Sequence, residues 1–534
     1  MRKAFASLTT LVFCTLLLPA VVLGQGKSEV MKPDHFDKSP APLREMFDRG
    51  GKPEAARGGR DFEPGRPHPV GNTNPAGVDP LVERNNASVS AYTQPKAGSV
   101  GVGIDPTYRV APPDTTGDLG PNHYVQWVNL RYAVYDVVRD SSGQIAAFNL
   151  KAGFPKNGNT IWQGFGGPCE TMNDGDPIVQ YDQLANRWVL TQFAVSATPY
   201  TQCVAVSTGP DPTGSYYRYS YSFGKDFNDF PKMGVWPDGY YITYNMFRGG
   251  RTFSGSNVCA FERAKMLLGQ TARQVCVRTT AAASIQPADL EGTTPPVGTA
   301  NPMLTIGTST LGAMRYSVNW ATGVGTLTGP TTVPGVATFS RACGGGACIP
   351  QTGTSQLLDS LGDRLNYRLS YRNFGTHEAM TINHPVATGG VSAIRWYELR
   401  NATGQSLSTA APVVYQQGTY SPSPAAHRWM GSAALDKTGG IAIGYNISSS
   451  TTRPGIRYTG RGPGDPLGAL GSESFVMDGG GSQMTTLARW GDYSTISVDP
   501  VDGCTMVFTT EFIPANGTYN WSTYIYSFKL STCQ

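Results

Sequence analysis

The sequence predicts an all-β fold, a single β-propeller of seven units (with six as the alternative) that follows a disordered N-terminal leader. From about residue 100 onward, short runs rich in Tyr, Val, Thr and Ile alternate between apolar and polar residues, with Gly, Pro, Asp or Asn between them. Long amphipathic helices are missing, and residues 261–269 are the one short helical candidate. The 64 Gly and 26 Tyr suit many short strands joined by tight turns.

Pairs of apolar runs recur at intervals of roughly 55 to 65 residues, near the upper end for propeller repeats. Each pair is expected to be an inner strand, a turn and a second strand. Five pairs are clear and two are looser; they begin at Asn122, Asp176, Lys232, Trp429 and Tyr493, and at Met303 and Arg364. A strand at Val100 to Ile104 would complete the last unit and close the ring. A pair of β-sandwiches is the alternative architecture.

The first 95 residues differ from the rest. Arg2 and Lys3 precede an apolar run that ends in a small-residue cleavage site before Gln25, so residues 1–24 are interpreted as a secretory signal peptide. The run is too short to span a membrane. Residues 25–95 are rich in Pro, Gly and charge and lack apolar periodicity, which predicts a flexible leader or propeptide. The propeller domain is expected over residues 96–534.

Cysteine use agrees with export. Nine Cys are present, and Cys14 lies in the signal peptide. An even remainder in an exported chain favours disulfides, and no spacing typical of a metal site occurs. Proximity along the chain predicts the pairs Cys169–Cys203, Cys259–Cys276, Cys343–Cys348 and Cys504–Cys533.

Several function classes are excluded. Lys plus Arg number 42 and Asp plus Glu 38, without the basic stripe that nucleic-acid binding requires. No G-x-S-x-G elbow, H-E-x-x-H helix or P-loop occurs. No cofactor is expected; a structural Ca²⁺ in the acidic turn at 173–176 is the alternative. Glu378 and His384 would share one strand face while His377 points away, so this run alone predicts no metal site.

Two turns carry a family likeness. Residues 435–440 and 497–505 resemble degenerate Asp-boxes, the hairpin turns of sialidase-type propellers. The resemblance implies that Asp436 and Asp499 stabilise turns. Residues 113–125, 363–373 and 489–493 also resemble segments of a group of exported bacterial propeller proteins, largely without an assigned function. The Arg-Ile-Pro segment of sialidases is absent, which argues against sialidase activity.

Ionisable residues precede or begin the proposed inner strands. In a propeller these strands line a central channel, and the loops entering them gather at one mouth. We therefore expect groups from different units, Asp118 included, to converge there. Two carboxylates could act as the acid and base, or acid and nucleophile, of glycoside cleavage, and arginines could bind a carboxylate or sulfate. The candidate catalytic residues are Asp176, Asp229, Asp363, His427 and Asp492, and the candidate substrate-binding residues are Arg364, Arg428 and Arg489.

The structural alternative is that these groups satisfy turn amides and join neighbouring units. The sequence thus predicts a secreted monomeric propeller that acts on or recognises an extracellular polysaccharide or glycoconjugate, as a glycoside hydrolase or polysaccharide lyase. A non-catalytic binding or adhesion module is the alternative.

Overall fold

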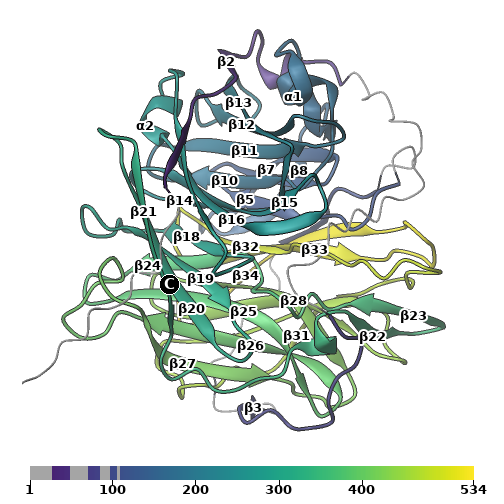
Figure 1. The fold of residues 1–534 in the computed structure, drawn as a ribbon. Helices are drawn as coiled ribbons and strands as arrows, with labels where there is room; N and C mark the ends of the chain where they lie inside the picture. The colour runs from purple at the N-terminus through teal and green to yellow at the C-terminus, as the bar shows by residue number, and fades with distance from the viewer. Residues whose placement is uncertain (1–26, 49–69, 84–88, 90–96, 105–108) are drawn as a thin grey trace, which may run out of the picture.

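The computed structural model describes residues 27–48, 70–83, 89, 97–104 and 109–534 (Figure 1). The predicted signal peptide lies outside the described residues. The fold is all-β, as predicted. Helical structure in the described part is limited to single turns, and the predicted helical candidate contains α2 (Arg263–Met266). No helix in these ranges is long and apolar enough to cross a membrane.

Most strands fall into antiparallel units of four that follow one another along the chain. The first three units are β5 (Thr116–Leu119), β6 (His123–Val128), β7 (Arg131–Arg139), β8 (Ile145–Leu150); β10 (Ile178–Asp182), β11 (Arg187–Ala194), β12 (Tyr200–Ser207), β13 (Tyr216–Gly224); and β14 (Asp226–Val235), β15 (Tyr240–Arg248), β16 (Thr252–Phe261), β17 (Gln274–Thr279).

The next three units are built in the same way. They are β18 (Gln286–Glu291), β19 (Asn301–Ile306), β20 (Leu311–Asn319), β21 (Val324–Thr332); β24 (Leu369–Asn373), β25 (Glu378–Thr388), β26 (Val391–Arg400), β27 (Val413–Tyr420); and β28 (His427–Leu435), β29 (Ile441–Ser448), β30 (Gly455–Arg461), β31 (Ser474–Asp478). A separate hairpin, β22 (Ala347–Gln351) and β23 (Thr354–Asp359), leads into the second of these.

The last unit combines the three C-terminal strands with one strand from the N-terminal part of the chain. Strands β32 (Thr495–Val498), β33 (Thr505–Phe512) and β34 (Ser522–Lys529) are joined by β4 (Ala97–Val100), with Tyr524 paired to Val100. The prediction that an early strand completes this unit is confirmed, but the observed strand shares only Val100 with the predicted range of Val100 to Ile104. Such closure leaves few unpaired edges.

The first strand of each unit contacts the first strand of the next, and β32 contacts β5, so these strands form a closed ring. Strands β18 and β24 are hydrogen-bonded to each other in parallel. In Figure 1 the first strands β5, β10, β18 and β32 lie toward the middle of the molecule, while β13 and β27 lie toward its outside. This is the radial arrangement of a β-propeller, and the alternative of two sandwiches is wrong because the first strands form one ring.

Two predicted inner strands are second strands instead. The run beginning at Asn122 is β6, and the run beginning at Met303 falls within β19. The true first strands, β5 and β18, are short and rich in polar residues although they are almost entirely buried. Apolar alternation therefore pointed to their neighbours.

All four predicted disulfides are confirmed. Their Cα atoms lie 5.8, 4.0, 5.3 and 5.5 Å apart, within or close to the usual range. The 259–276 bridge joins the neighbouring strands β16 and β17. The 504–533 bridge ties the end of the chain to the start of β33.

Parts of the N-terminal segment are folded onto the ring. Strand β1 (Glu29–Met31) extends the third unit beside β17, β2 (His35–Lys38) extends the second beside β13, and β3 (Val82–Glu83) lies beside β27. The expectation of a flexible leader does not hold for these residues. Composition alone does not reveal that the outer edges of existing sheets supply their backbone hydrogen bonds.

A buried ion pair holds residues 70–83, the stretch that contains β3. Arg395 Nη2 lies 2.7 Å from both carboxylate oxygens of Asp79, and the side chains are 0% and 1% exposed. Arg395 also donates to Thr419 Oγ1 at 2.6 Å. The pair therefore locks residues 70–83 against the fifth unit.

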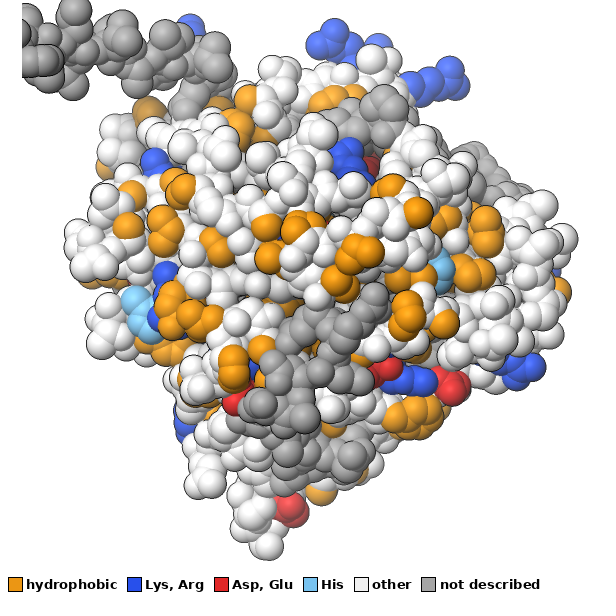
Figure 2. All heavy atoms as spheres, turned by 90° about the horizontal axis from the view of Figure 1, so that it is seen from below, with side chains coloured by type: hydrophobic (Ala, Val, Ile, Leu, Met, Phe, Trp, Pro, Cys, Tyr) orange, Lys and Arg blue, Asp and Glu red, His pale blue; other side chains and the backbone are white. Residues whose placement is uncertain are grey.

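Surface apolar side chains do not gather into one large patch on the face seen from below. Figure 2 shows them scattered among polar side chains, with few charged groups. Isolated apolar residues of this kind are normal for a protein surface.

Substituting Asp79→Ala should lower the free energy of unfolding by about 3–5 kcal/mol, because it leaves the Arg395 guanidinium buried and unpaired. Arg44→Ala is the control, since Arg44 and Asp211 are 3.7 Å apart with half-exposed side chains, and such pairs contribute about 0–1 kcal/mol. Denaturant unfolding of both variants checks this. Equal losses would show that the buried pair does not anchor the segment.

Candidate functional site

The turns that enter the inner strands have an unusual backbone. Six non-glycine residues in these turns or at bulges within the inner strands, among those that the structure describes, have φ between 42° and 55°. They are Asp114, Asp176, Phe230, Ser284, Met430 and Asp492. This left-handed conformation costs an L-residue about 1 kcal/mol or more, and such strain gathers at functional sites. We call this end of the channel the mouth.

Three carboxyl groups from consecutive units meet at the mouth. Asp114 is 5% exposed, and within the described part of the chain its carboxyl accepts no hydrogen bond. Burial, reinforced by the charge of Asp176, raises the pKa of Asp114 well above 3.8. Burial also raises the pKa of Asp176, and burial together with the Asp176 charge raises the pKa of Asp229 to about 7. Crowded carboxyls of this kind can supply one protonated and one ionised group.

A lysine and two aromatic residues lie beside the three carboxyl groups. Lys232 Nζ lies 3.3 Å from the centre of the Tyr493 ring and 3.6 Å from that of Phe230. Burial lowers the pKa of Lys232 well below 10.5, opposed by the charge of Asp176 and by the two ring faces. The Tyr493 hydroxyl donates to Asp176 Oδ2 at 2.5 Å. That hydrogen bond favours the ionised form of Asp176 and fixes its position.

The predicted substrate-binding arginines are each paired with a nearby acid. Arg364 binds both oxygens of Asp363 at 2.9 and 3.0 Å. Arg489 pairs with Asp492. The third, Arg428, binds Glu473 at 2.6 and 3.2 Å. Their guanidinium charges are therefore compensated within the protein.

The structure brings only part of the predicted catalytic set together. Asp176 and Asp229 lie in the carboxyl trio, whereas Asp363 and Asp492 are the arginine partners just described. His427 Nδ1 accepts a hydrogen bond from the Ser392 amide at 3.3 Å, and burial lowers the pKa of His427 to about 4. His427 and Arg428 precede an irregularity in the pairing of β28, and both make their contacts away from the trio.

Four site residues are not predicted from the sequence: Asp114, Phe230, Lys232 and Tyr493. The signal for Asp114 exists, since an Asp also stands directly before the inner strand at Asp176. The sequence places the inner strand of the first unit at Asn122, whereas β5 begins at Thr116, so Asp114 does not stand at the predicted entry. The sequence predicts that Lys232 and Tyr493 begin strands, and nothing in it shows that their side chains meet.

Behind the mouth, hydrogen bonds connect side chains and backbone from three units. Gln180 Nε2 donates to the Tyr367 hydroxyl at 2.5 Å and to the Met233 carbonyl at 2.9 Å. The Tyr367 hydroxyl donates to the same carbonyl at 2.9 Å. These groups from the second, third and fifth units separate the mouth from the far end of the channel.

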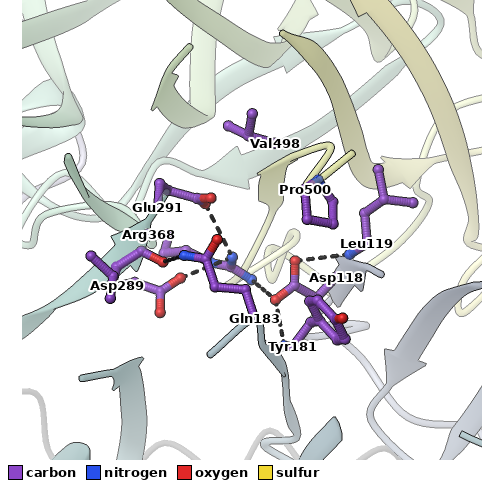
Figure 3. Close-up of a pocket in the computed structure, with 10 residues that line it drawn as sticks. Asp118, Leu119, Tyr181, Gln183, Asp289, Glu291, Arg368, Val498 and Pro500 are labelled. Atoms are coloured by element: carbon purple, nitrogen blue, oxygen red, sulfur yellow. Dashed lines mark hydrogen bonds and ion pairs between the residues drawn. The ribbon is translucent and has the colours of Figure 1, made fainter. Parts of the chain in front are cut away.

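The far end is organised by one buried arginine (Figure 3). Arg368 lies 3.3 Å from Asp118, 3.0 Å from Asp289 and 3.9 Å from Glu291. Asp118 accepts the Tyr181 amide at 2.7 Å, and Asp289 accepts the Val235 amide at 2.8 Å. Asp118, expected at the mouth, is therefore at the opposite end.

The pocket between these groups is small. Its free volume is about 10 Å³, about enough for one water. Burial raises the pKa of Asp289 to about 6, and burial with the Asp289 charge raises that of Glu291 to about 8, against the opposing charges of Arg372 and Arg368. This end joins units together and is too tight for a sugar.

Other candidate groups are engaged in structure. Glu378 accepts the Tyr371 hydroxyl at 2.7 Å, and His384 Nε2 lies 3.0 Å from the Tyr397 hydroxyl. In the acidic turn at 173–176, the Asp174 carboxylate accepts the Val195 and Ser196 amides at 2.5 and 2.7 Å. A structural Ca²⁺ there stays a prediction. Asp436 accepts the Gly440 amide at 2.9 Å and so closes its own turn.

No family model and no curated protein matches the chain. Among solved structures it is similar to an endo-arabinase from Bacteroides thetaiotaomicron, at 13% identity over 53% of this chain and 92% of that one, with a TM-score of 0.27. An α-L-arabinofuranosidase from Podospora anserina is 9% identical over 82% and 97% of the two chains, with a TM-score of 0.29. One from Lactobacillus brevis is 10% identical over 66% and 89%, with a TM-score of 0.27. Similarity this slight carries no argument about chemistry.

Replacing Glu291 by Gln should flatten the dependence of stability on pH. The folded protein holds the Glu291 proton up to about pH 8, whereas the unfolded chain releases it near its ordinary pKa. Between these values the folded state binds more protons, so wild-type stability falls as pH rises, by up to about 1.4 kcal/mol per pH unit. The variant should therefore gain stability over the wild type at pH 8.5 and not at pH 4.

Thermal unfolding from pH 4 to 9 measures this difference. Glu45→Gln, whose side chain is 59% exposed, is the matched control and should track the wild type. Parallel curves for Glu291→Gln and the wild type would show that Glu291 ionises normally.

Proposed function

We propose that this chain is an exported, seven-bladed β-propeller that cleaves glycosidic bonds of an extracellular glycan at the channel mouth. The observation that carries the proposal is the meeting of Asp114, Asp176 and Asp229, three carboxyl groups whose pKa values are all raised by their surroundings. Perturbed carboxyls at the end of a channel are typical of acid–base sites.

The blade number rests on the strand pairing. Seven antiparallel units of four strands can be traced in the described residues, counting β4 in the last unit and dividing one long sheet at the parallel β18–β24 pair. Each contributes one first strand to the ring. Four disulfides support an oxidising, extracellular location.

Asp229 is the proposed general acid. Asp229 is a half-buried residue, and its pKa of about 7 keeps its carboxyl largely protonated in mildly acidic solution, so that it can protonate a leaving oxygen. Asp176 is the proposed nucleophile or base, because the Tyr493 hydroxyl stabilises its ionised form. The two residues come from neighbouring units and could flank one glycosidic bond.

Asp229→Asn and Asp176→Asn should each lower kcat about 10²- to 10⁴-fold, the usual contribution of general acid–base groups. The measurement is release of oligosaccharides from a panel of neutral and charged polysaccharides, followed by mass spectrometry. Asp136→Asn, with a 45% exposed side chain on β7, is the matched control and should keep full activity.

Absence of cleavage across the panel by the correctly folded wild type would contradict the proposal. Retention of the protein on one glycan without cleavage would then favour the binding module.

The pH profile of kcat/KM should be bell-shaped. Activity should rise with pH as Asp176 ionises, with a midpoint above the ordinary value of 3.8, and should fall through about pH 7 as Asp229 loses its proton. In Tyr493→Phe the rising limb should move to higher pH, because the hydrogen bond that favours ionised Asp176 is lost. A falling limb well away from pH 7 would contradict the role of Asp229.

A further inference from the structure

The charge balance at the mouth bears on the class of glycan. Arg364 and Arg489 are both engaged by aspartates next to them in sequence. A substrate carboxylate or sulfate would have to compete with these short-range partners for the guanidinium groups. The mouth is therefore poorly equipped to bind an anion, contrary to the expectation from the sequence.

Carboxyl groups outnumber the cations at the same place. Asp114 and Asp176 share the compensating charges of Lys232 and Arg489, and Asp229 those of Arg364 and Arg489, which already face Asp363 and Asp492. Asp114 is 5% exposed, and its carboxyl accepts no hydrogen bond within the described residues. A buried polar group without a partner is costly unless a ligand or water satisfies it. A ligand that donates hydrogen bonds and carries positive charge would satisfy Asp114 and offset its crowding with Asp176.

The mouth already accommodates one amino group. Lys232 Nζ is held against the ring faces of Tyr493 and Phe230, with the charges of Asp176 and Asp114 favouring its protonated form. Aromatic faces beside carboxylates are the environment in which proteins bind organic cations. A second amino group would find the same kind of surroundings.

We propose that the glycan bound at this mouth carries free amino groups, as in a polymer of glucosamine-type sugars, and that Asp114 determines this preference. The inference rests on the proposed function, since it concerns the same site. The substrate ammonium would pair with Asp114 and shift that carboxyl to its ionised form. A uronate would instead add a like charge to the trio.

Four oligosaccharides of equal length test the proposal with the full-length protein. They are a β-1,4-linked glucosamine hexamer, its N-acetylated counterpart, cellohexaose and a β-1,4-linked uronate hexamer. Dissociation constants are measured by calorimetry at pH 6 and two salt concentrations, and products by mass spectrometry. We expect the glucosamine hexamer to bind at least about tenfold more tightly than cellohexaose, as one partly buried charge pair would give, and to weaken with salt.

Asp114→Asn should reduce the preference for the amino hexamer to within about twofold of cellohexaose, whereas Asp136→Asn should retain it. Because Asp114 is buried, its variant is first checked by thermal unfolding. Asp229→Asn, at a partly exposed position in the same trio, provides a second test and should weaken the same preference.

The two proposals can fail separately. Selective binding of the amino hexamer without cleavage would support the inference and overturn glycosidic cleavage. Cleavage or tighter binding of the uronate hexamer would overturn the inference and leave cleavage standing. Equal affinity for all four hexamers, or no binding to any of them, would overturn the inference.

Discussion

A single guanidinium constrains the centre of this fold. Arg368, from the fifth unit, reaches Asp118 of the first and Asp289 of the fourth. Those two carboxylates also accept amides of the second and third units, from Tyr181 and Val235. An arginine that is buried to this degree is tolerated only when its charge is fully compensated. The relative positions of five inner strands therefore depend on one network of charge-assisted hydrogen bonds.

The geometry of the mouth depends on that network. Inner strands fixed at one end must present their entry turns close together at the other, because each strand is only four to six residues long in β5, β10 and β18. Left-handed residues in those turns then direct Asp114, Asp176 and Asp492 toward one another. The resulting crowding of carboxyls works against stability and suits chemistry, as is common at functional sites. Tyr367 lies between the two charged clusters, facing Lys232 on one side and Arg368 on the other.

Local patterns in the sequence predicted much of the fold. The sequence predicts the cysteine pairs and the strands β10, β11, β28 and β29, because each depends on residues close together in the chain. First strands such as β5 and β18 were not, since their burial comes from the ring and not from their own apolarity. The same limit explains the folded N-terminal stretches, whose partners lie far away in sequence, as Asp79 and Arg395 show.

For the site, the sequence identified the correct residue types at the entries to the inner strands but not their pairing. Asp176 and Asp229 meet as expected, while Arg364 and Arg489 turn to the aspartates beside them. The acidic residue with which an arginine pairs depends on side-chain directions, which the sequence pattern does not specify. The site predicted to bind an anion is therefore rich in carboxyl groups. Asp114 is recognised as one of them only from the position of β5 in the structure.

The central claim is that Asp114, Asp176 and Asp229 behave as one coupled group. Carboxyl-carbon NMR of protein labelled with ¹³C-aspartate, titrated from pH 3 to 9, tests it most directly. The account predicts three resonances with midpoints above 3.8, of which the Asp229 signal titrates near 7, and it predicts that Asp176→Asn lowers the midpoint of Asp229. Independent titration of all three near 3.8, unchanged in the variant, would contradict it.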